Sequence, residues 1–360
     1  SVCIVIMAIL TGIYVIAGGY MATAINDFIQ GIIMLFGIVA VIAAVLMSKG
    51  GFTAALDGLA KVTDETVSTT PGVFASFFGA DPLNLMFVVI LTSLGTWGLP
   101  QMVQKFYAIK DESSIKKGTI ISTIFALVVA GGSYFLGGFG RLYSDKIDVK
   151  ANGFDSIIPT MLSELSAPLI ALVVILVLSA SMSTLSSLVI ASSSTLTIDF
   201  LKDNIVKKMD EKKQLLSIRI FVVIFIAISA ILALVQYKSS VTFIAQLMGI
   251  SWGALAGAFL APFLYSLYWK KTTKAACWVS FVFGTGLMVI DLIGNLTGHH
   301  ILPTIMQSPI NCGAIAMLGG FVIVPIVSLI TPKPDSKFVE ETFACYKEKH
   351  EVEQDIALGD

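Results

Sequence analysis

LVLSASMSTLSSLVIASSSTLTID (residues 176–199) combines an apolar background with eleven serine and threonine hydroxyls. No charged side chain occurs in it before Asp199, so a helix of this composition can cross a membrane. In hydrocarbon every polar group must find its partner within the protein, and this helix therefore cannot simply face lipid. The segment predicts a membrane protein in which a spanning helix turns a polar face toward other helices.

One face of this predicted helix is lined with small and hydroxyl-bearing residues. Four of them are spaced i, i+3, i+4 and i+7: Ala180, Ser183, Thr184 and Ser187. Hydroxyls and loosened backbone carbonyls form an oxygen-only ligand set, which suits an alkali cation that sheds its water. The alternative is that the hydroxyls only hold helices together, as small residues commonly do in membranes. Spacing alone leaves both interpretations open.

The composition extends the membrane prediction to the whole chain. Hydrophobic residues make up 56% and charged residues only 13% of the 360 residues, whereas soluble domains contain about a quarter charged residues. The mean hydropathy is +0.88. A net charge of −1 gives no indication of a nucleic-acid partner. We therefore expect an all-α polytopic membrane protein that is surrounded by lipid.

Hydropathy and segment length predict about nine spanning helices. Lysines concentrate in alternate connections, within residues 105–117, 202–219 and 270–274, and the positive-inside rule assigns these connections to the cytoplasm. This topology leaves Ser1 outside and the tail from Lys333 inside. Because the chain opens directly into an apolar segment, without Met or a basic flank, we expect it to be cut from a longer protein. The predicted spans lie near residues 1–16, 25–48, 83–105, 115–140, 167–200, 215–236, 241–268, 272–296 and 311–331.

The third predicted span is interrupted. It contains LTSLGTWGLPQMVQKF (residues 91–106), in which Pro100 removes a hydrogen bond and bends the backbone. Backbone breaks inside membrane proteins line cavities or are repaired by neighbouring helices. A solute site and a structural kink are therefore both compatible with this pattern. An aromatic face, polar side chains and freed carbonyls make five residues candidate solute contacts: Thr92, Thr96, Trp97, Pro100 and Gln101.

Two carboxylates fall near the ends of predicted spans. Asp27 lies in AINDFIQG at the start of the second span, where a carboxylate within hydrocarbon requires a partner or a water-filled vestibule. An interfacial acid at the positive end of its own helix is the alternative. Asp291 lies about a turn from the outer end of the eighth span, and we expect it to be interfacial.

The seventh predicted span carries a small-residue seam. Gly249, Gly253, Gly257 and Ala261 follow strict four-residue spacing. Such a row predicts close packing against another helix. Gln246, near the start of this seam, is a further candidate to border a solute cavity.

Four blocks resemble the sodium/solute symporter family, which includes bacterial proline, pantothenate and sugar carriers. GGYMATAINDFIQG resembles the family's GG…TDxxQ block, with Asn26 in place of the usual Thr. WGLPQMVQKFYAIKD is similar to the block that ends the sixth core helix, and SASMSTLSSLVIASSSTLTIDF is similar to the sodium-site helix. SLYWKKTTKAA resembles the close of the tenth core helix. The blocks occur in the family's order over most of residues 10–275.

The resemblance implies a leucine-transporter-like fold, with two inverted repeats of five helices and with sodium and solute bound near mid-membrane. The first three core helices are expected to be absent from this chain, so the fold would be incomplete. The implied segments are residues 1–48 for the last two helices of the first repeat, 49–82 for an extracellular loop, 83–269 for the second repeat, 270–332 for two peripheral helices and 333–360 for a cytoplasmic tail.

The resemblance also assigns roles to individual residues. The sodium-site motif falls on the carbonyl of Ala180 and the hydroxyls of Ser183 and Thr184. Asp27 becomes a candidate in sodium release or coupling. The solute positions are those around the break in the third span, where sugar carriers tend to have Asn-Gln-Tyr and this chain has Leu-Pro-Gln at residues 99–101. This departure favours an amino acid or a small carboxylate, such as proline or pantothenate, as the solute.

These observations predict sodium-coupled symport by alternating access, with Na+ as coupling ion and no organic cofactor, in the inner membrane of a bacterium. A carrier of sugars or other solutes from the same family is one alternative. A transporter-derived sensor is another, but residues 333–360 are too few for a signalling domain. An HExxH motif does not occur in the sequence, so a metallohydrolase is not predicted. Coupling to protons in place of sodium is a further alternative, and it would require a titratable carboxylate or histidine beside the ion site. The sequence carries no signal for the oligomeric state.

Overall fold

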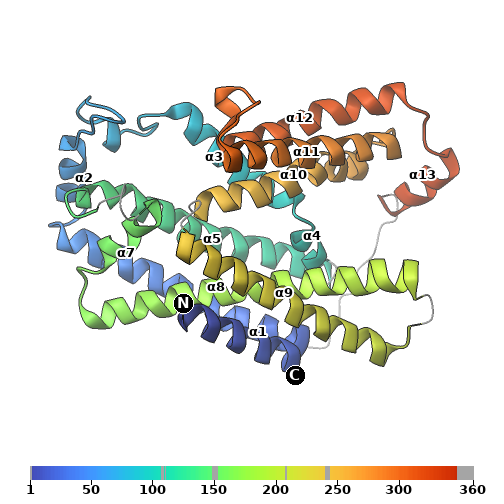
Figure 1. Cartoon of the computed structure of the whole chain (residues 1–360), viewed down its shortest axis with the longest axis horizontal. Coiled ribbons are helices and arrows are strands. Elements are labelled where there is room, and N and C mark those ends of the chain that lie inside the picture. The colour runs from blue at the N-terminus through green and yellow to red at the C-terminus, as the bar shows by residue number, and fades with distance from the viewer. Residues whose placement is uncertain are drawn as a thin grey trace. The chain divides into compact units, whose positions relative to one another are not determined.

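The computed structural model describes residues 2–106, 109, 111–147, 153–206, 209–239 and 244–346 (Figure 1). Across these residues the chain forms helices and turns, with an isolated bridge between Asp64 and Ser68 and no β-strand. Packing divides the chain into two compact units. Unit 1 comprises Ser1–Leu85 and Val103–Ile244, and unit 2 comprises Met86–Met102 and Ala245–Asp360.

Within the described residues, seven helices are long and apolar enough to cross a membrane, as expected for an all-helical membrane protein. They are α1 (Val2–Ser48), α5 (Glu112–Gly138, continued by η3, Phe139–Tyr143), α8 (Ala167–Thr195, continued by the π-helix η5, Leu196–Ile205), α9 (Glu211–Ser239), α10 (Ile244–Tyr268), α11 (Lys274–Thr297) and α12 (Pro309–Ile330).

Short elements connect or follow these helices. They are α2 (Phe52–Lys61), η1 (Val73–Ala75), α3 (Pro82–Ser93), η2 (Gly95–Gly98), α4 (Pro100–Phe106), η4 (Phe154–Ser156), α7 (Ile157–Leu162), η6 (Thr304–Met306), α13 (Ser336–Thr342) and η7 (Phe343–Tyr346). Of the predicted tail, residues 347–360 lie outside the described residues.

Helix α1 consists of two arms. Gly19 lies inside it with φ 59° and ψ −154°, a backbone conformation that essentially only glycine adopts. The chain turns back at this residue, and both arms lie beside α8 (Figure 1). On the second arm Asp27 contacts Ser187. Further along the same arm, Gly37 packs against Leu176, so this arm runs antiparallel to α8.

All nine predicted spans have helical counterparts in the described chain. The spans near residues 1–16 and 25–48 are the two arms of α1. The third is the broken segment α3–η2–α4, whose apolar part is too short to be counted among the seven membrane-length helices. The other six correspond to α5 and to α8 through α12.

Several helix ends carry the capping groups that their sequences favour. Asp111 is the N-cap residue of α5, and its carboxylate accepts a hydrogen bond from the Ser114 amide at 2.7 Å. The Thr273 hydroxyl accepts from the Ala276 amide at the start of α11. These side chains satisfy amides that have no partner within their own helix.

Short helices cover the core of unit 1 at the ends of the long ones. Ala55 and Leu59 of α2 are buried together with Phe139. Met161 and Leu162 of α7 are buried in a second cluster with residues of α1 and α5. Burial of these apolar side chains stabilises the connections, because each fully buried Leu, Met or Phe side chain contributes about 1.5–3 kcal/mol.

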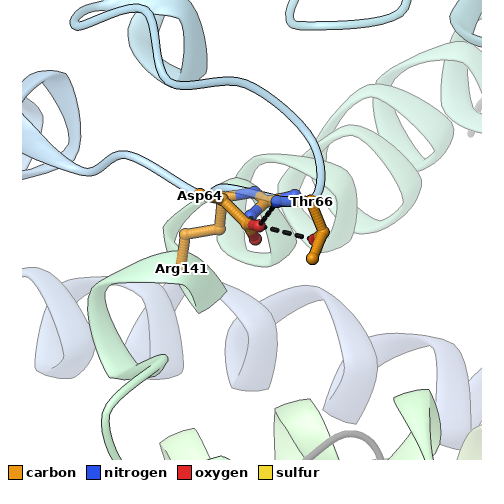
Figure 2. Close-up of polar contacts among 3 residues, drawn as sticks. All are labelled: Asp64, Thr66 and Arg141. Atoms are coloured by element: carbon orange, nitrogen blue, oxygen red, sulfur yellow. Dashed lines mark hydrogen bonds and ion pairs between the residues drawn. The ribbon is translucent and has the colours of Figure 1, made fainter.

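An ion pair ties the connection after α2 to the end of α5. The Arg141 guanidinium lies 2.9 Å from the carboxylate of Asp64 and stacks over the Phe74 ring at 3.9 Å. The Thr66 amide and hydroxyl donate to the other oxygen of Asp64, at 2.8 and 2.6 Å; Figure 2 shows these contacts of the carboxylate. The Thr66 hydrogen bonds, together with Arg141, lower the pKa of the Asp64 carboxyl from 3.8 to about 2 because they favour its ionised form.

Asp64→Asn should loosen this connection. The amide keeps the shape of the side chain but loses the ion pair, so we expect amide hydrogen exchange in residues 62–78 to accelerate by up to about fivefold. The folded state favours the carboxylate, so its contribution is present above pH 3.8 and is lost as pH falls through about 2. Wild-type protein should therefore keep its protection at pH 4. Asp57→Asn, on the exposed side of α2, is the matched control. Equal exchange in the two variants would contradict the role of the ion pair.

The small-residue seam predicted in unit 2 is confirmed. A Cβ atom at Gly253 would lie 2.6 Å from the Cα of Gly313 on α12, and one at Gly284 would lie 2.3 Å from the carbonyl carbon of Gly257. Ala261, at the end of the seam, is fully buried. Helix α10 therefore meets α11 and α12 backbone to backbone, which only small residues permit.

Candidate functional site

The three predicted sodium ligands lie on α8 of unit 1. The Thr184 hydroxyl donates a hydrogen bond to the carbonyl of Ala180 at 3.0 Å. The carbonyl of Ser183 accepts a hydrogen bond from the Ser186 hydroxyl at 2.9 Å. A hydroxyl that donates its hydrogen keeps both oxygen lone pairs. The Thr184 hydroxyl oxygen therefore keeps the capacity to bind a cation, whereas the carbonyl of Ala180 already accepts this hydroxyl in addition to its helical hydrogen bond.

Asp27 contacts the same hydroxyl face of α8. Its Oδ2 accepts a hydrogen bond from the Ser187 hydroxyl at 3.2 Å, and Ser187 is the last member of the face that the spacing predicts. Its other oxygen, Oδ1, is buried and has no hydrogen-bond partner within the described part of the chain. Of the two interpretations of Asp27, the structure thus favours the buried carboxylate that contacts another helix.

Further residues of α1 carry polar groups in this part of unit 1. Tyr14, on the first arm of α1, interacts electrostatically with Asp27 and donates from its hydroxyl to the carbonyl of Met182 at 3.1 Å. Two buried oxygens of α1, Thr11 Oγ1 and Gln30 Oε1, lack partners among the residues described. Sequence analysis did not identify these α1 residues as site candidates. Tyr14 and Met182 are 168 residues apart in the chain, so no local pattern predicts their contact.

The donor chemistry of this region fits a hard monovalent cation. Its groups are carbonyl, hydroxyl and carboxylate oxygens, the ligands that alkali ions accept when they lose water. A buried carboxylate oxygen without a donor is unfavourable unless a cation or a proton compensates its charge. The Asp27 oxygen is therefore the strongest indication of an ion in unit 1.

The predicted solute contacts lie around a confirmed helix break in unit 2. Leu99, between η2 and α4, has the extended conformation φ −84°, ψ 116°. Gly98 packs against Leu260 of α10, where a Cβ atom would lie 2.6 Å from the Leu260 Cβ. The interruption is therefore held in place by close packing as well as by Pro100.

The side chains at the break differ in their contacts. Thr92 donates back to the carbonyl of Val88 at 2.8 Å and Thr96 to that of Ser93 at 3.1 Å. Trp97 is 57% exposed. Five candidates thus share one helix break: Thr92, Thr96, Trp97, Pro100 and Gln101. Gln246 belongs to the first turn of a separate helix, α10.

Comparison with known proteins identifies the same family as the sequence blocks. The profile of the sodium:solute symporter family matches residues 1–284. The chain is 27% identical over 327 residues to the osmoregulated proline transporter of Bacillus subtilis. It is 28% identical over 326 residues to the sodium/pantothenate symporter of Haemophilus influenzae. It is 27% identical over 350 residues to a sodium/proline symporter of Staphylococcus aureus.

These alignments cover 89%, 88% and 94% of this chain. They cover 62%, 63% and 63% of the three relatives, so the chain spans less than two thirds of their length. The structure of a Na+-coupled sialic acid symporter in a substrate-bound outward-open state matches with a TM-score of 0.65 and 15% identity. That match covers 93% of this chain and 67% of the symporter.

The structural likeness establishes the fold, which is all-helical and of the leucine-transporter-like kind. The family profile covers well over half of the chain. The predicted sodium-site helix, the broken third span and the Asp27 block all lie within the matched residues 1–284. The chain belongs to the sodium:solute symporter family.

Proposed function

We propose that the protein containing this chain is a secondary transporter that couples the entry of Na+ to the uptake of a small organic solute. The observation that carries the proposal is the contact of the Asp27 carboxylate with Ser187 on the hydroxyl face of α8. It joins a buried charge to the helix that bears the proposed sodium ligands. Membership of the sodium:solute symporter family supports the same activity.

In this proposal Na+ is held by the carbonyl of Ala180 and the hydroxyls of Ser183 and Thr184. Asp27 acts one helical turn away as the coupling group, since a carboxylate beside the ion path can hold the cation during entry or release. An inward membrane potential contributes about 2.3 kcal/mol per 100 mV for each charge that crosses. No titratable side chain other than Asp27 is required.

Coupling by alternating access sets a thermodynamic condition. Sodium must bind one conformation more tightly than the other, because an ion with equal affinity for both shifts no equilibrium. The ion that favours the outward conformation then also tightens solute binding there. In this scheme the broken segment α3–η2–α4 supplies the solute contacts, with Trp97 as the aromatic face and the freed carbonyls and Gln101 as polar partners.

The solute is proposed to be an amino acid or a small carboxylate. Residues 99–101 read Leu-Pro-Gln where sugar carriers tend to have Asn-Gln-Tyr. The relatives reported above are named as proline and pantothenate symporters, which supports this class. A sugar or another solute of the same family is the second candidate, because the structural neighbour is a sialic acid symporter.

The location and orientation follow from the same proposal. The named relatives are bacterial, so we infer an integral protein of the bacterial inner membrane. The lysine-rich connections assign the tail after Lys333 to the cytoplasm. The chain serves as a carrier and not as an enzyme.

A sodium-dependent uptake screen tests the proposed function. The complete protein would be reconstituted in vesicles and offered labelled proline, pantothenate, other amino acids, small carboxylates and sugars. We expect uptake of one amino acid or carboxylate that requires a sodium gradient and that stops when choline replaces sodium. Uptake that does not depend on sodium, or that is driven by a proton gradient instead, would overturn the proposal.

Ser183→Ala and Thr184→Ala should each weaken sodium coupling. Each change removes one neutral oxygen ligand, which costs about 1–1.5 kcal/mol and raises the half-saturating sodium concentration about tenfold. The matched control is Ser181→Ala, which removes an exposed hydroxyl of the same helix that is not among the proposed ligands. The measurement is uptake as a function of sodium concentration. Unchanged sodium dependence in both variants would discard the assigned site.

A further inference from the structure

Asp291 is a buried carboxylate outside the proposed transport site. It lies on α11 in unit 2, and 1% of the residue is exposed. Its position in the sequence suggests an interfacial acid, but the side chain is buried within the protein. Its Oδ1 accepts a hydrogen bond from the Asn295 side chain at 3.0 Å. Its Oδ2 is buried and has no partner among the described residues.

The packing register of α11 and α12 brings a second acceptor opposite this oxygen. The two helices are antiparallel neighbours: Phe283 packs against Gly319, and the Asn295 side chain donates to the carbonyl of Gln307 at 3.4 Å. Residues four apart on each helix therefore stay opposite one another, which places Asn311 across from Asp291. The Oδ1 of Asn311 is likewise buried without a partner in the part of the chain that the structure describes.

Positive charge is scarce around Asp291. None of the salt bridges among the described residues involves it. Helix α10, packed against α11, has no acidic, basic or histidine side chain. On α12 the nearby ionisable group is Cys312, whose thiol contacts the carbonyl of Leu287.

Among the residues that the structure describes, a further ionisable neighbour is His300, in the connection between α11 and α12. It is exposed, and its ring lies against Gly294, where a Cβ atom would come within 3.1 Å of Nδ1. Gly294 follows Asp291 by three residues and thus lies on the same face of α11. His300 is therefore a solvent-exposed ionisable group close to the face of α11 that carries the buried carboxyl.

We propose that Asp291 is a proton-binding site, in which the carboxyl carries a proton on Oδ2 and donates it to Oδ1 of Asn311. Two facing acceptors need one donor between them, and a single proton supplies it without leaving a charge in the apolar interior. The proton exchanges with solvent past His300. An alkali cation fits less well, because two free oxygens are far fewer than the ligands that replace a hydration shell.

Infrared spectroscopy of the purified complete protein tests this site. A protonated carboxyl has a C=O stretching band that a carboxylate lacks. We expect such a band at about neutral pH, and we expect Asp291→Asn to remove it. Asp57→Asn, a change at an exposed acid, should leave it in place. Asn311→Leu keeps the carboxyl but removes its acceptor, so it should shift the band to higher frequency. Aspartate labelled with 13C at the carboxyl assigns the band to an aspartate, and its shift in Asn311→Leu links it to Asp291 even if Asp291→Asn does not fold.

Two results would overturn the proposal. The first is a spectrum without a protonated aspartate band from about pH 6 to pH 8, which would show that the carboxyl is ionised, as it would be if a reversed Asn311 amide donated to it. The second is loss of the band when sodium replaces N-methyl-glucamine, which would make this a sodium site. Because the measurement needs no transport, its outcome is independent of the proposed function.

Discussion

Asp27→Asn should abolish sodium-driven uptake while the protein stays folded. The buried carboxylate has one oxygen on the Ser187 hydroxyl and one without a partner in the described residues, so the amide preserves its shape but removes the charge that would attract the cation. Loss of one member of a buried charged contact costs about 3–5 kcal/mol. We therefore expect the half-saturating sodium concentration to rise at least about 100-fold, which in a transport assay is indistinguishable from no uptake.

Two further variants separate coupling from structure. Asp57→Asn changes an exposed acid in α2 and should transport normally. Ser187→Ala should reduce sodium affinity about tenfold, and the double variant should be no worse than Asp27→Asn alone if the hydroxyl acts through the carboxylate. Gel filtration in detergent verifies folding. Normal sodium dependence in folded Asp27→Asn would remove this residue from the mechanism.

Gly284→Ala should destabilise unit 2 more than any other single added methyl group that we propose. The new Cβ would lie 2.3 Å from the carbonyl carbon of Gly257 and 2.5 Å from the amide nitrogen of Ala258. Both neighbours are backbone atoms of α10 and cannot rotate away. The helices must separate, so we expect a loss of about 3 kcal/mol or more in the free energy of unfolding, at the upper end of overpacking costs.

Gly286→Ala is the matched control, because it lies on the same helix and its Cβ would meet no atom within 4 Å. Alanine favours a helix over glycine by up to about 1 kcal/mol, so this variant should be as stable as wild type or slightly more stable. The measurement is the free energy of unfolding in mixed micelles. Equal effects of the two substitutions would show that the α10–α11 contact does not set the stability.

Local properties of the sequence determined the class of protein and its elements. Hydrophobic segments of membrane length predicted the helices, because hydrophobicity and the period of 3.6 residues belong to each segment by itself. The same reasoning predicted the hydroxyl face of α8, the interruption at Pro100 and the seam beginning at Gly249. The family could be recognised because its motifs are short, contiguous blocks of residues.

Contacts between distant residues were decided by the tertiary structure alone. Asp27 and Ser187 are 160 residues apart, and the sequence left the partner of this carboxylate open. The reversal at Gly19 brings Tyr14 to the same carboxylate. The sequence predicts an interfacial acid at Asp291. The register of α11 against α12 instead buries this residue opposite Asn311. Helical periodicity specifies which face a side chain occupies, but only packing specifies what that face meets, since each helix has several neighbours of similar hydrophobicity.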